Sequence, residues 1–482
     1  MQFNSNLFHL AQIVQLVDRM GDVSVHASNL YAFVRESSYD ALPKGVRCRA
    51  ERCLIDLLGT AAAGLGTPLS RIIREHVIRG LNSGPSAPGA RMLFDGRRAS
   101  PMGAALAGGM TIDSFDAHDG HALTKGHAGA AVLPGLLALA DAAPEPMSGT
   151  EFLAALVIGY EVAIRAGIAQ HATTLDYHTS GAWNGIGVAA MAGRCWGLDV
   201  EKFRHAIGIA EFHGPRSQMM RCIDFPTMVK DGSGWGAMCG VSAAYLAAEG
   251  FTGSPALVVE SEAVHRFWSD LGDRWRILEM YFKPYPICRW AQPAVEAALT
   301  LRRMHAVDPA AIEIVEIETF HEAVRLDQHR PRTTEEAQYS LPFPVATAIV
   351  YGKLAPTDIS GAALSEPGVL AMSERVRLIE AKDLNARFPA ERYARARFRL
   401  ADGAVLESDA IPARGDPERP LSDAEITEKF HELADEPLGR REAESLLETI
   451  VNLNKQDDVS DLLARVLSAQ RGSTGHRRIA AG

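Results

Sequence analysis

The chain has 482 residues, 47% of them hydrophobic, and a formal net charge of -10. At roughly 100–200 residues per domain, this length predicts two or three domains with substantial cores. The acidic balance argues against a general nucleic-acid-binding protein, which usually carries a basic face. Six cysteines without CxxC spacing favour a reduced compartment over a disulfide framework: Cys48, Cys53, Cys195, Cys222, Cys239 and Cys288.

The N-terminal segment has neither the basic start nor the small-residue cleavage site of a signal peptide. No apolar run approaches eighteen residues without a charge or a strong breaker, so we expect no membrane association and a cytoplasmic location. Residues 1–25 form a predicted N-terminal extension, in which FHLAQIVQLVDRM has the apolar spacing of an amphipathic helix. Such a helix would pack on a neighbouring element or on a second subunit.

Residues 26–289 are predicted to form a helical domain. A long helix with Val46, Cys53, Leu54 and Leu57 on one side follows a Pro/Gly break, and PMGAALAGGM predicts a helix of small residues. Further on, Ser148 with Glu151 and then Asp199 are expected N-terminal caps of two more helices.

The pattern changes after about residue 289. AIEIVEIETF alternates as a strand, and ARARFRLADGAVLESDAI predicts a hairpin that turns at Asp402-Gly403. Residues 290–415 are therefore expected to be a smaller α+β lid domain inserted into the helical one. Residues 416–470 return to helices that rejoin the first domain, and residues 471–482 form a flexible tail. The predicted fold class is mainly α.

Ionisable residues are concentrated in TIDSFDAHDGHALTKGHAGAAVLP, between two apolar helix-like segments. Buried charge is costly unless it is paired or used, so a dense cluster beside core residues is a candidate site. Seven side chains belong to this cluster: Asp113, Asp116, His118, Asp119, His121, Lys125 and His127.

Three interpretations of the cluster compete. Charged loops between helices are commonly solvated and without function, but the segment after His127 has no polar side chain before Pro134. A metal site could use His118, His121, His127 and an aspartate, although HExxH or comparable spacing is absent. Acid–base catalysis without a metal needs only a carboxylate that orients an imidazole, and we predict this arrangement with no metal ligand assigned.

Other candidates lie further along the chain. His178 precedes a Gly/Ser-rich helix start whose free backbone N–H groups favour an anion. GIGVAA is not a dinucleotide-binding loop, because no β-branched strand precedes it. Lys230 stands before a glycine-rich turn, and Lys283 lies among aromatics and prolines near Arg289, as expected for a site that binds carboxylates. Asp231 occupies the first glycine position of GxSxG, which excludes a serine hydrolase.

In these segments the chain resembles the MmgE/PrpD family, which includes 2-methylcitrate dehydratase, cis-aconitate decarboxylase and iminodisuccinate epimerase. The resemblance extends over residues 30–467, and its motifs occur in order: AALAGGMTIDSFDAHDG, GHAGAAVLP, GYEVAIRAG, MVK with GSGWGAMCG, FKPYPICRW and AQYSLPFPVATAIVYG. It implies a helical domain with an α+β lid, an active site between the two, a homodimer and no organic cofactor. By matching position, the family's functional residues fall on Asp116 with Asp119, His127, His178, Lys230 and Lys283.

The chain departs from the family pattern at three places. His127-Ala128-Gly129 replaces His-Pro-Ser or His-Pro-Gly, and Asp119-Gly120 replaces Asp-Thr, which removes a hydroxyl. Phe343 stands where the decarboxylases carry a catalytic tyrosine, so Tyr339 or Tyr285 would have to replace it. His118, His121 and Lys125 have no assured counterpart.

The shared chemistry is proton transfer at a carbon next to a carboxylate. We expect His127, oriented by Asp116, to act as base or acid, His178 to serve the opposite face, and Lys230 and Lys283 to stabilise developing charge. Expected substrate contacts come from Asp119, Lys125, Arg289 and Tyr339. The predicted function is a cofactor-independent lyase, a dehydratase or decarboxylase, acting on a small di- or tricarboxylate. An epimerase of a dicarboxylic amino-acid derivative such as iminodisuccinate, and a metal-dependent or non-catalytic carboxylate binder, are the alternatives.

Overall fold

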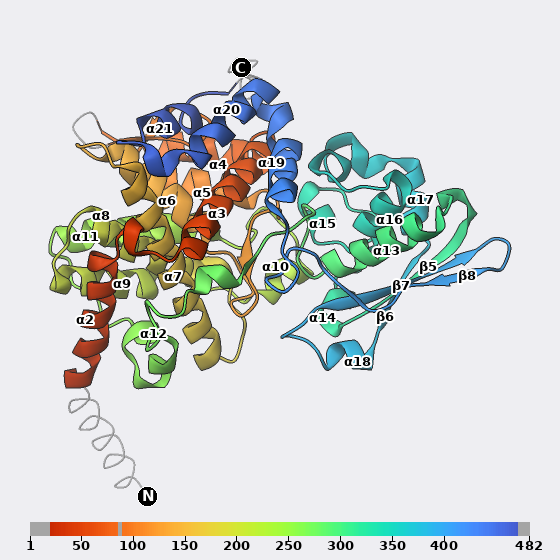
Figure 1. The fold of residues 1–482 in the computed structure, drawn as a ribbon, viewed down its shortest axis with the longest axis horizontal. Helices are drawn as coiled ribbons and strands as arrows, with labels where there is room; N and C mark the ends of the chain where they lie inside the picture. The colour runs from red at the N-terminus through yellow and green to blue at the C-terminus, as the bar shows by residue number, and fades with distance from the viewer. Residues whose placement is uncertain (1–19, 85–88, 471–482) are drawn as a thin grey trace, which may run out of the picture.

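The computed structural model describes residues 20–84 and 89–470. Most of the expected amphipathic segment within residues 1–25, and the expected tail at residues 471–482, lie outside these residues. As the sequence predicts, the fold is mainly helical, with a large helical domain and a smaller α+β domain beside it (Figure 1). Each domain is built around its own hydrophobic core.

The helical domain contains most of the helices of the chain. Its N-terminal part comprises α2 (Met20–Glu36), α3 (Lys44–Gly64), α4 (Pro68–Gly80), α5 (Pro101–Asp113), α6 (Gly129–Ala142), α7 (Gly149–Thr173), α8 (Asn184–Cys195), α9 (Val200–His213), α10 (Met220–Asp224), α11 (Ser233–Ala248) and α12 (Leu257–Glu260). Two short antiparallel pairs accompany them, β1 (Ala90–Arg91) with β2 (Arg98–Ala99), and β3 (Gly120–His121) with β4 (Met280–Tyr281).

Small residues set the spacing of the central helices. A Cβ atom at Gly109 in α5 would lie 2.5 Å from the Cα atom of Gly234 in α11, so the two backbones are nearly in contact there. Ser148 and Asp199 cap α7 and α9 through their side chains, as predicted. By length and composition α7 could cross a membrane, but its apolar window is entirely buried, as in the core helix of a soluble domain.

The lid domain contains one mixed sheet. Its elements are α13 (Gln292–His305), β5 (Ile312–Thr319), α14 (His321–Val324), α15 (Thr334–Gln338), α16 (Pro342–Tyr351), α17 (Pro367–Ser373), β6 (Val376–Glu380), α18 (Lys382–Asn385), β7 (Tyr393–Leu400), β8 (Val405–Glu407) and β9 (Ile411–Pro412). The strand order is β6-β5-β7-β8, with β9 also paired to β7, and only β5 and β6 run parallel. The predicted turn joins β7 to β8, with Gly403 at φ 87°.

The chain then returns to the helical domain. The C-terminal helices are α19 (Asp423–Leu438), α20 (Arg440–Val451) and α21 (Ser460–Val466). α19 packs on α3 and is fixed there by an ion pair between Lys429 and Asp56, with Nζ and Oδ1 2.5 Å apart. Figure 1 shows these blue helices covering the red and orange N-terminal helices, with the lid to one side.

Candidate functional site

The predicted cluster lies in the loop between α5 and α6, where the two domains meet. β3 lies within this loop and pairs with β4, so that Gly120 is opposite Tyr281 and His121 is opposite Met280. Because β4 ends two residues before Lys283, this pairing brings Lys283 to the loop. Ser233, the first residue of α11, donates its backbone N–H to Asp113 at 3.3 Å and fixes the other end of the loop.

Asp116 and Lys283 form the central ion pair of the site, and both side chains are buried. The backbone N–H of Asp116 and the Nζ atom of Lys230 both donate to Oε1 of Gln338, at 2.8 and 2.6 Å. Burial alone would raise the pKa of Asp116, but Lys283, His127 and Lys230 outweigh it and hold that pKa well below its usual value. Asp116 is therefore a permanent carboxylate.

His127 is held in one tautomer by the main chain. Its Nδ1 atom lies 2.6 Å from the carbonyl oxygen of Asp119, so Nδ1 carries the proton and donates it there. The Nε2 atom is left as an acceptor, 3.7 Å from Oδ1 of Asp116. Burial, followed by the charge of Lys283, lowers the pKa of His127 well below its ordinary value, so the imidazole is neutral. The expected orienting group, the Asp116 carboxylate, is instead committed to Lys283.

Asp231 is the second titratable group beside His127, and its Oδ2 atom lies 3.9 Å from Nε2. The hydroxyl of Ser180 donates to the same Oδ2 at 2.5 Å, and Ser180 Oγ accepts the backbone N–H of His127 at 2.9 Å. Burial, followed by the nearby Asp113, raises the pKa of Asp231 to about 7. Near neutral pH this carboxyl group holds a proton that the neutral His127 can accept.

Asp119 acts on the site through its backbone, because its side chain points away from the cavity. The hydroxyl of Tyr160 donates to Oδ2 of Asp119 at 2.5 Å. Burial and the neighbouring Asp56 raise the pKa of Asp119 to about 6. Asp119 thus holds His127 through its carbonyl oxygen, and its side chain is not among those that line the cavity; its predicted substrate contact stays a prediction.

The departures from the family pattern have structural explanations. A Cβ atom at Gly120 would lie 2.4 Å from the hydroxyl oxygen of Tyr281, so this hydroxyl occupies the space of the missing side chain. Phe343 is fully buried in the lid core. Of the two tyrosines that could replace it, Tyr339 lines the cavity, whereas Tyr285 donates its hydroxyl to Glu296 at 2.8 Å.

The cavity beside His127 measures about 40 Å³, which leaves room for very little besides water. Substrate entry therefore requires side chains or the lid to move. Two acids, four cations and several apolar and aromatic side chains line the cavity. The acids are Asp116 and Asp231, and the cations are Lys125, Lys283, Arg289 and Arg392. Lys125 and Lys230 have positive φ values of 50° and 48°, a strain that clusters at functional sites, although Phe94 and Ala306 share it outside the cavity lining.

The cavity lining does not include His178, His121 or Lys230. The Nζ atom of Lys230 is bonded to Gln338 and lies over the Tyr339 ring, 4.7 Å from its centroid. His178 is stacked on His171 with ring centroids 6.5 Å apart, its Nδ1 lies 3.0 Å from the Asp176 carbonyl oxygen, and its backbone pairs with Gln218. His178 is therefore held by contacts outside the cavity lining, and its predicted role on the opposite face stays a prediction. His121 is turned to Glu279, with Nε2 and Oε2 3.2 Å apart.

A metal ion would find three possible donors in the described part of the chain. Ligand atoms of Asp116, His118 and His127 lie within 4.8 Å of one another. His121, the third imidazole of the metal interpretation, is not among them. The ammonium group of Lys283 is already paired with Asp116, so a cation there would displace or face another cation. Two imidazoles and one carboxylate are a donor set that divalent ions do use, so what opposes a metal here is the Lys283 ammonium group and not the ligand types.

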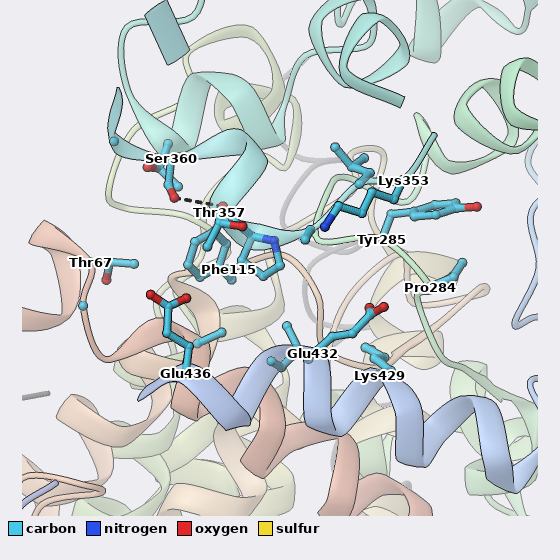
Figure 2. Close-up of a pocket in the computed structure, with 18 of the residues that line it drawn as sticks. Thr67, Phe115, Pro284, Tyr285, Lys353, Thr357, Ser360, Lys429, Glu432 and Glu436 are labelled. Carbon is cyan, nitrogen blue, oxygen red and sulfur yellow. Dashed lines mark hydrogen bonds between the residues drawn. The ribbon is translucent and has the colours of Figure 1, made fainter. Parts of the chain in front are cut away.

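A larger cavity, of about 1340 Å³, is also lined by residues of both domains. Figure 2 shows Glu432 and Glu436 of α19 on one wall and Lys353, Thr357 and Ser360 of the lid on the opposite one. None of the residues that surround His127 Nε2 lines this cavity. We place the candidate site at the smaller one, where the groups able to transfer a proton meet.

Profile comparison assigns both domains to one family. The MmgE/PrpD N-terminal domain matches residues 28–271, and the MmgE/PrpD C-terminal domain matches residues 285–455. The chain belongs to the MmgE/PrpD family. The boundary between the two matches falls near β4 and Lys283, where the backbone passes from the helical domain to the lid.

Curated relatives span nearly the full length of the chain. A cis-aconitate decarboxylase-like protein of Aspergillus oryzae is 23% identical, over 92% of this chain and 97% of the relative. The cis-aconitate decarboxylases of Mus musculus and Homo sapiens are each 25% identical, over 88% and 86% of this chain and 90% and 89% of theirs. These similarities support an enzyme of the lyase class.

Sequence reasoning missed several residues of the site. Asp231 entered only as the residue that breaks a hydrolase motif, although its position next to Lys230 was a usable signal. Gln338 and Ser180 are ordinary polar residues, and Arg392 is one of many arginines in the lid. These three carry no local pattern, because long-range packing alone brings them to the site.

Proposed function

We propose that this protein is a cofactor-independent decarboxylase of a small unsaturated tricarboxylate of the cis-aconitate type. One observation carries the proposal: the His127 imidazole and the Asp231 carboxyl group, whose pKa burial raises to about 7, lie side by side in a buried cavity that four cations and Asp116 also line. This arrangement favours an anionic substrate and supplies one proton. The decarboxylase names of the relatives support the choice among lyases.

The reaction needs one proton and no redox partner. In a β,γ-unsaturated acid, cleavage of the bond to the leaving carboxylate frees an electron pair that forms a new double bond. The electrons of the former double bond move toward a neighbouring carboxylate, giving an enediolate-like anion. Protonation of the carbon next to that carboxylate completes the reaction, with CO₂ as the second product. His127 carries the proton and the Asp231 carboxyl group stores it.

The bound polyanion itself drives the proton transfer. In the free site the pKa of His127 is depressed by burial and by Lys283. Substrate carboxylates bring negative charge next to the ring and raise this pKa. The imidazole then takes the proton of Asp231 through Nε2 and delivers it to carbon. Lys283 lines the cavity and would stabilise the enediolate charge directly, while Lys230, bonded to Gln338 outside the lining, would add to the positive field. Such electrostatic stabilisation is usually the largest share of catalysis.

Epimerisation is a weaker alternative in this geometry. It requires acid–base groups on both faces of one carbon, and His178 was the expected second group. His178 lies outside the cavity lining, while Asp231 is only 3.9 Å from His127, so these two serve the same face.

Proton NMR in deuterated buffer distinguishes the reactions. Aconitate-like, citrate-like and aspartate-derived acids are incubated with purified protein after its metal content has been measured. We expect the aconitate-like acid to yield CO₂ and a product with one deuterium next to a carboxylate. Three results would contradict the proposal. They are elimination of water from the citrate-like acid, proton exchange without loss of carbon in the aspartate derivative, and activity that depends on a stoichiometric metal.

The rate is expected to depend on pH through Asp231. Because the raised pKa keeps this carboxyl group protonated up to about pH 7, kcat/KM should fall roughly tenfold per pH unit above that value. Asp231→Asn should remove this pH dependence and lower the rate at pH 6. Asp402→Asn, in the exposed turn of the lid hairpin, is the matched control and should keep the wild-type profile.

Asp231→Asn should lower the rate but increase the stability of the folded protein. Asp231 has a folded-state pKa raised from 3.8 to about 7, so the folded protein binds the extra proton and loses stability as pH rises through that interval. At pH 8, Asp231→Asn is expected to increase the free energy of unfolding by up to about 4 kcal/mol. Urea denaturation at pH 5 and pH 8 measures this change, and an equal effect at both values would refute the assigned protonation state.

A further inference from the structure

We propose that Arg392, Arg289 and Lys125 form a distal anion subsite that binds a carboxylate of the substrate remote from the reacting carbon. This inference deepens the proposed function and rests on it. The three side chains line the same cavity as His127. Arg392 comes from the lid, Arg289 from the connection between the domains and Lys125 from the loop of the helical domain, so the subsite exists only when these elements meet.

Two buried guanidinium groups in this subsite have unused donors. Arg392 and Arg289 are 5% and 6% exposed. Within the described residues, Nε of Arg392 and Nη1 of Arg289 have no hydrogen-bond partner. An unpaired buried donor is costly, more so on a charged group. A carboxylate in the cavity would satisfy both donors and recover this cost.

The existing contacts hold both groups in place, and among the described residues Arg289 has an ion-pair partner whereas Arg392 has none. Arg289 pairs with Asp416 through Nη2 and lies over the Tyr281 ring, 4.9 Å from its centroid. Arg392 donates through Nη2 to the carbonyl oxygen of Ala122 at 3.3 Å, a long hydrogen bond that crosses between the domains. Its only ring contact among the described residues is with Phe388.

Three cations line this part of the cavity, and Asp416 forms an ion pair with one of them, Arg289. Burial and then Arg289 lower the pKa of Arg392. Burial and then Arg392 lower the pKa of Lys125 to about 8. Lys125 also lies over the ring of Tyr177, 4.0 Å from its centroid, which keeps the ammonium group at the cavity edge. An incoming carboxylate relieves the repulsion between these cations.

The subsite selects the class of substrate. Lys283, paired with Asp116, and Lys230, bonded to Gln338, serve the reacting end near His127. Arg392, Arg289 and Lys125 add a second cationic group of side chains, which suits a further carboxylate on the same molecule. We expect a preference for tricarboxylates over dicarboxylates that lack one terminal carboxylate. The bound carboxylate would also join the lid to the loop through Arg392 and Lys125.

Calorimetric titration with two inert acids tests the subsite without turnover. Propane-1,2,3-tricarboxylate carries one terminal carboxylate more than 2-methylbutanedioate. The wild-type protein should bind the tricarboxylate roughly 10- to 100-fold more tightly. Arg392→Gln should remove most of this difference, and Arg392→Lys should retain part of it, because lysine keeps the charge but loses the planar fork.

The control and a second variant make each outcome decisive. Arg395→Gln, three residues further along the chain in β7 and paired at the surface with Glu318 and Asp383, should keep the wild-type difference. Lys125→Gln, from the opposite domain, should reduce the difference and provides the test if Arg392→Gln does not fold. An undiminished difference in the subsite variants, or an equal loss for both acids, would overturn the subsite.

Failure of the subsite and failure of the proposed function give different results. If the tricarboxylate preference depends on Arg392 but no acid releases CO₂, the subsite stands and the decarboxylase proposal falls. If an aconitate-like acid is decarboxylated but Arg392→Gln leaves the preference for the tricarboxylate over the dicarboxylate unchanged, the decarboxylase stands and the subsite is wrong.

Discussion

Replacement of His127 by alanine is expected to lower the decarboxylation rate and the incorporation of solvent deuterium by roughly 10²- to 10⁴-fold, the usual share of general acid–base catalysis. His127 Nε2 is the acceptor that faces both Asp116 and Asp231, and its tautomer is fixed by the Asp119 carbonyl. Single-turnover measurements by NMR separate this loss from a change in substrate binding.

His178→Ala is the informative comparison for this variant. The sequence pattern makes both histidines candidates, but the structure places only His127 in the cavity lining. We expect His178→Ala to remain within a few-fold of the wild-type rate. A loss as large as that of His127→Ala would mean that His178 reaches the substrate in the closed state and would reopen a two-face mechanism. Undiminished exchange in His127→Ala would remove this residue from its role.

Lys283→Met is expected to abolish activity and to destabilise the protein by about 3–5 kcal/mol, because it leaves the buried Asp116 carboxylate without its ion-pair partner. Burial then dominates and the pKa of Asp116 rises. Urea denaturation measures the stability, and proton NMR of the aconitate-like acid measures the rate.

A double-mutant cycle distinguishes the two roles of Lys283. Asp116→Asn combined with Lys283→Met removes both charges and should recover most of the stability that the single variant loses. The activity should remain lost, because the enediolate would no longer face an ammonium group. Recovery of activity together with stability would mean that Lys283 only holds Asp116 in place and does not contribute to the chemistry.

Much of the fold follows from local pattern. Three correctly predicted features depend on interactions within a few residues, which a sequence displays directly. They are the helix caps Ser148 and Asp199, the alternating strand β5, and the turn at Asp402-Gly403. The mainly helical class follows for the same reason.

The assignment of roles depends on contacts between distant segments. Asp119 resembles a substrate ligand in the sequence, but Tyr160, which lies 41 residues away, binds its side chain and turns it from the cavity. Asp231 acquires its raised pKa from burial, Asp113 and the other groups around it. No local spacing specifies these neighbours, so periodicity and motifs could not predict them.

From the sequence, the apolar helices around the loop made Asp116 and His127 candidates, because buried charge is costly unless it is used, and the family resemblance added Lys230 and Lys283. Only the tertiary structure decided which of them meet. The pairing of β3 with β4 brings Lys283 to Asp116, packing of the lid adds Arg392, and the pairing of His178 with Gln218 withdraws that residue. Each is a contact across more than thirty residues, where three-dimensional packing and not local sequence sets the distance between side chains.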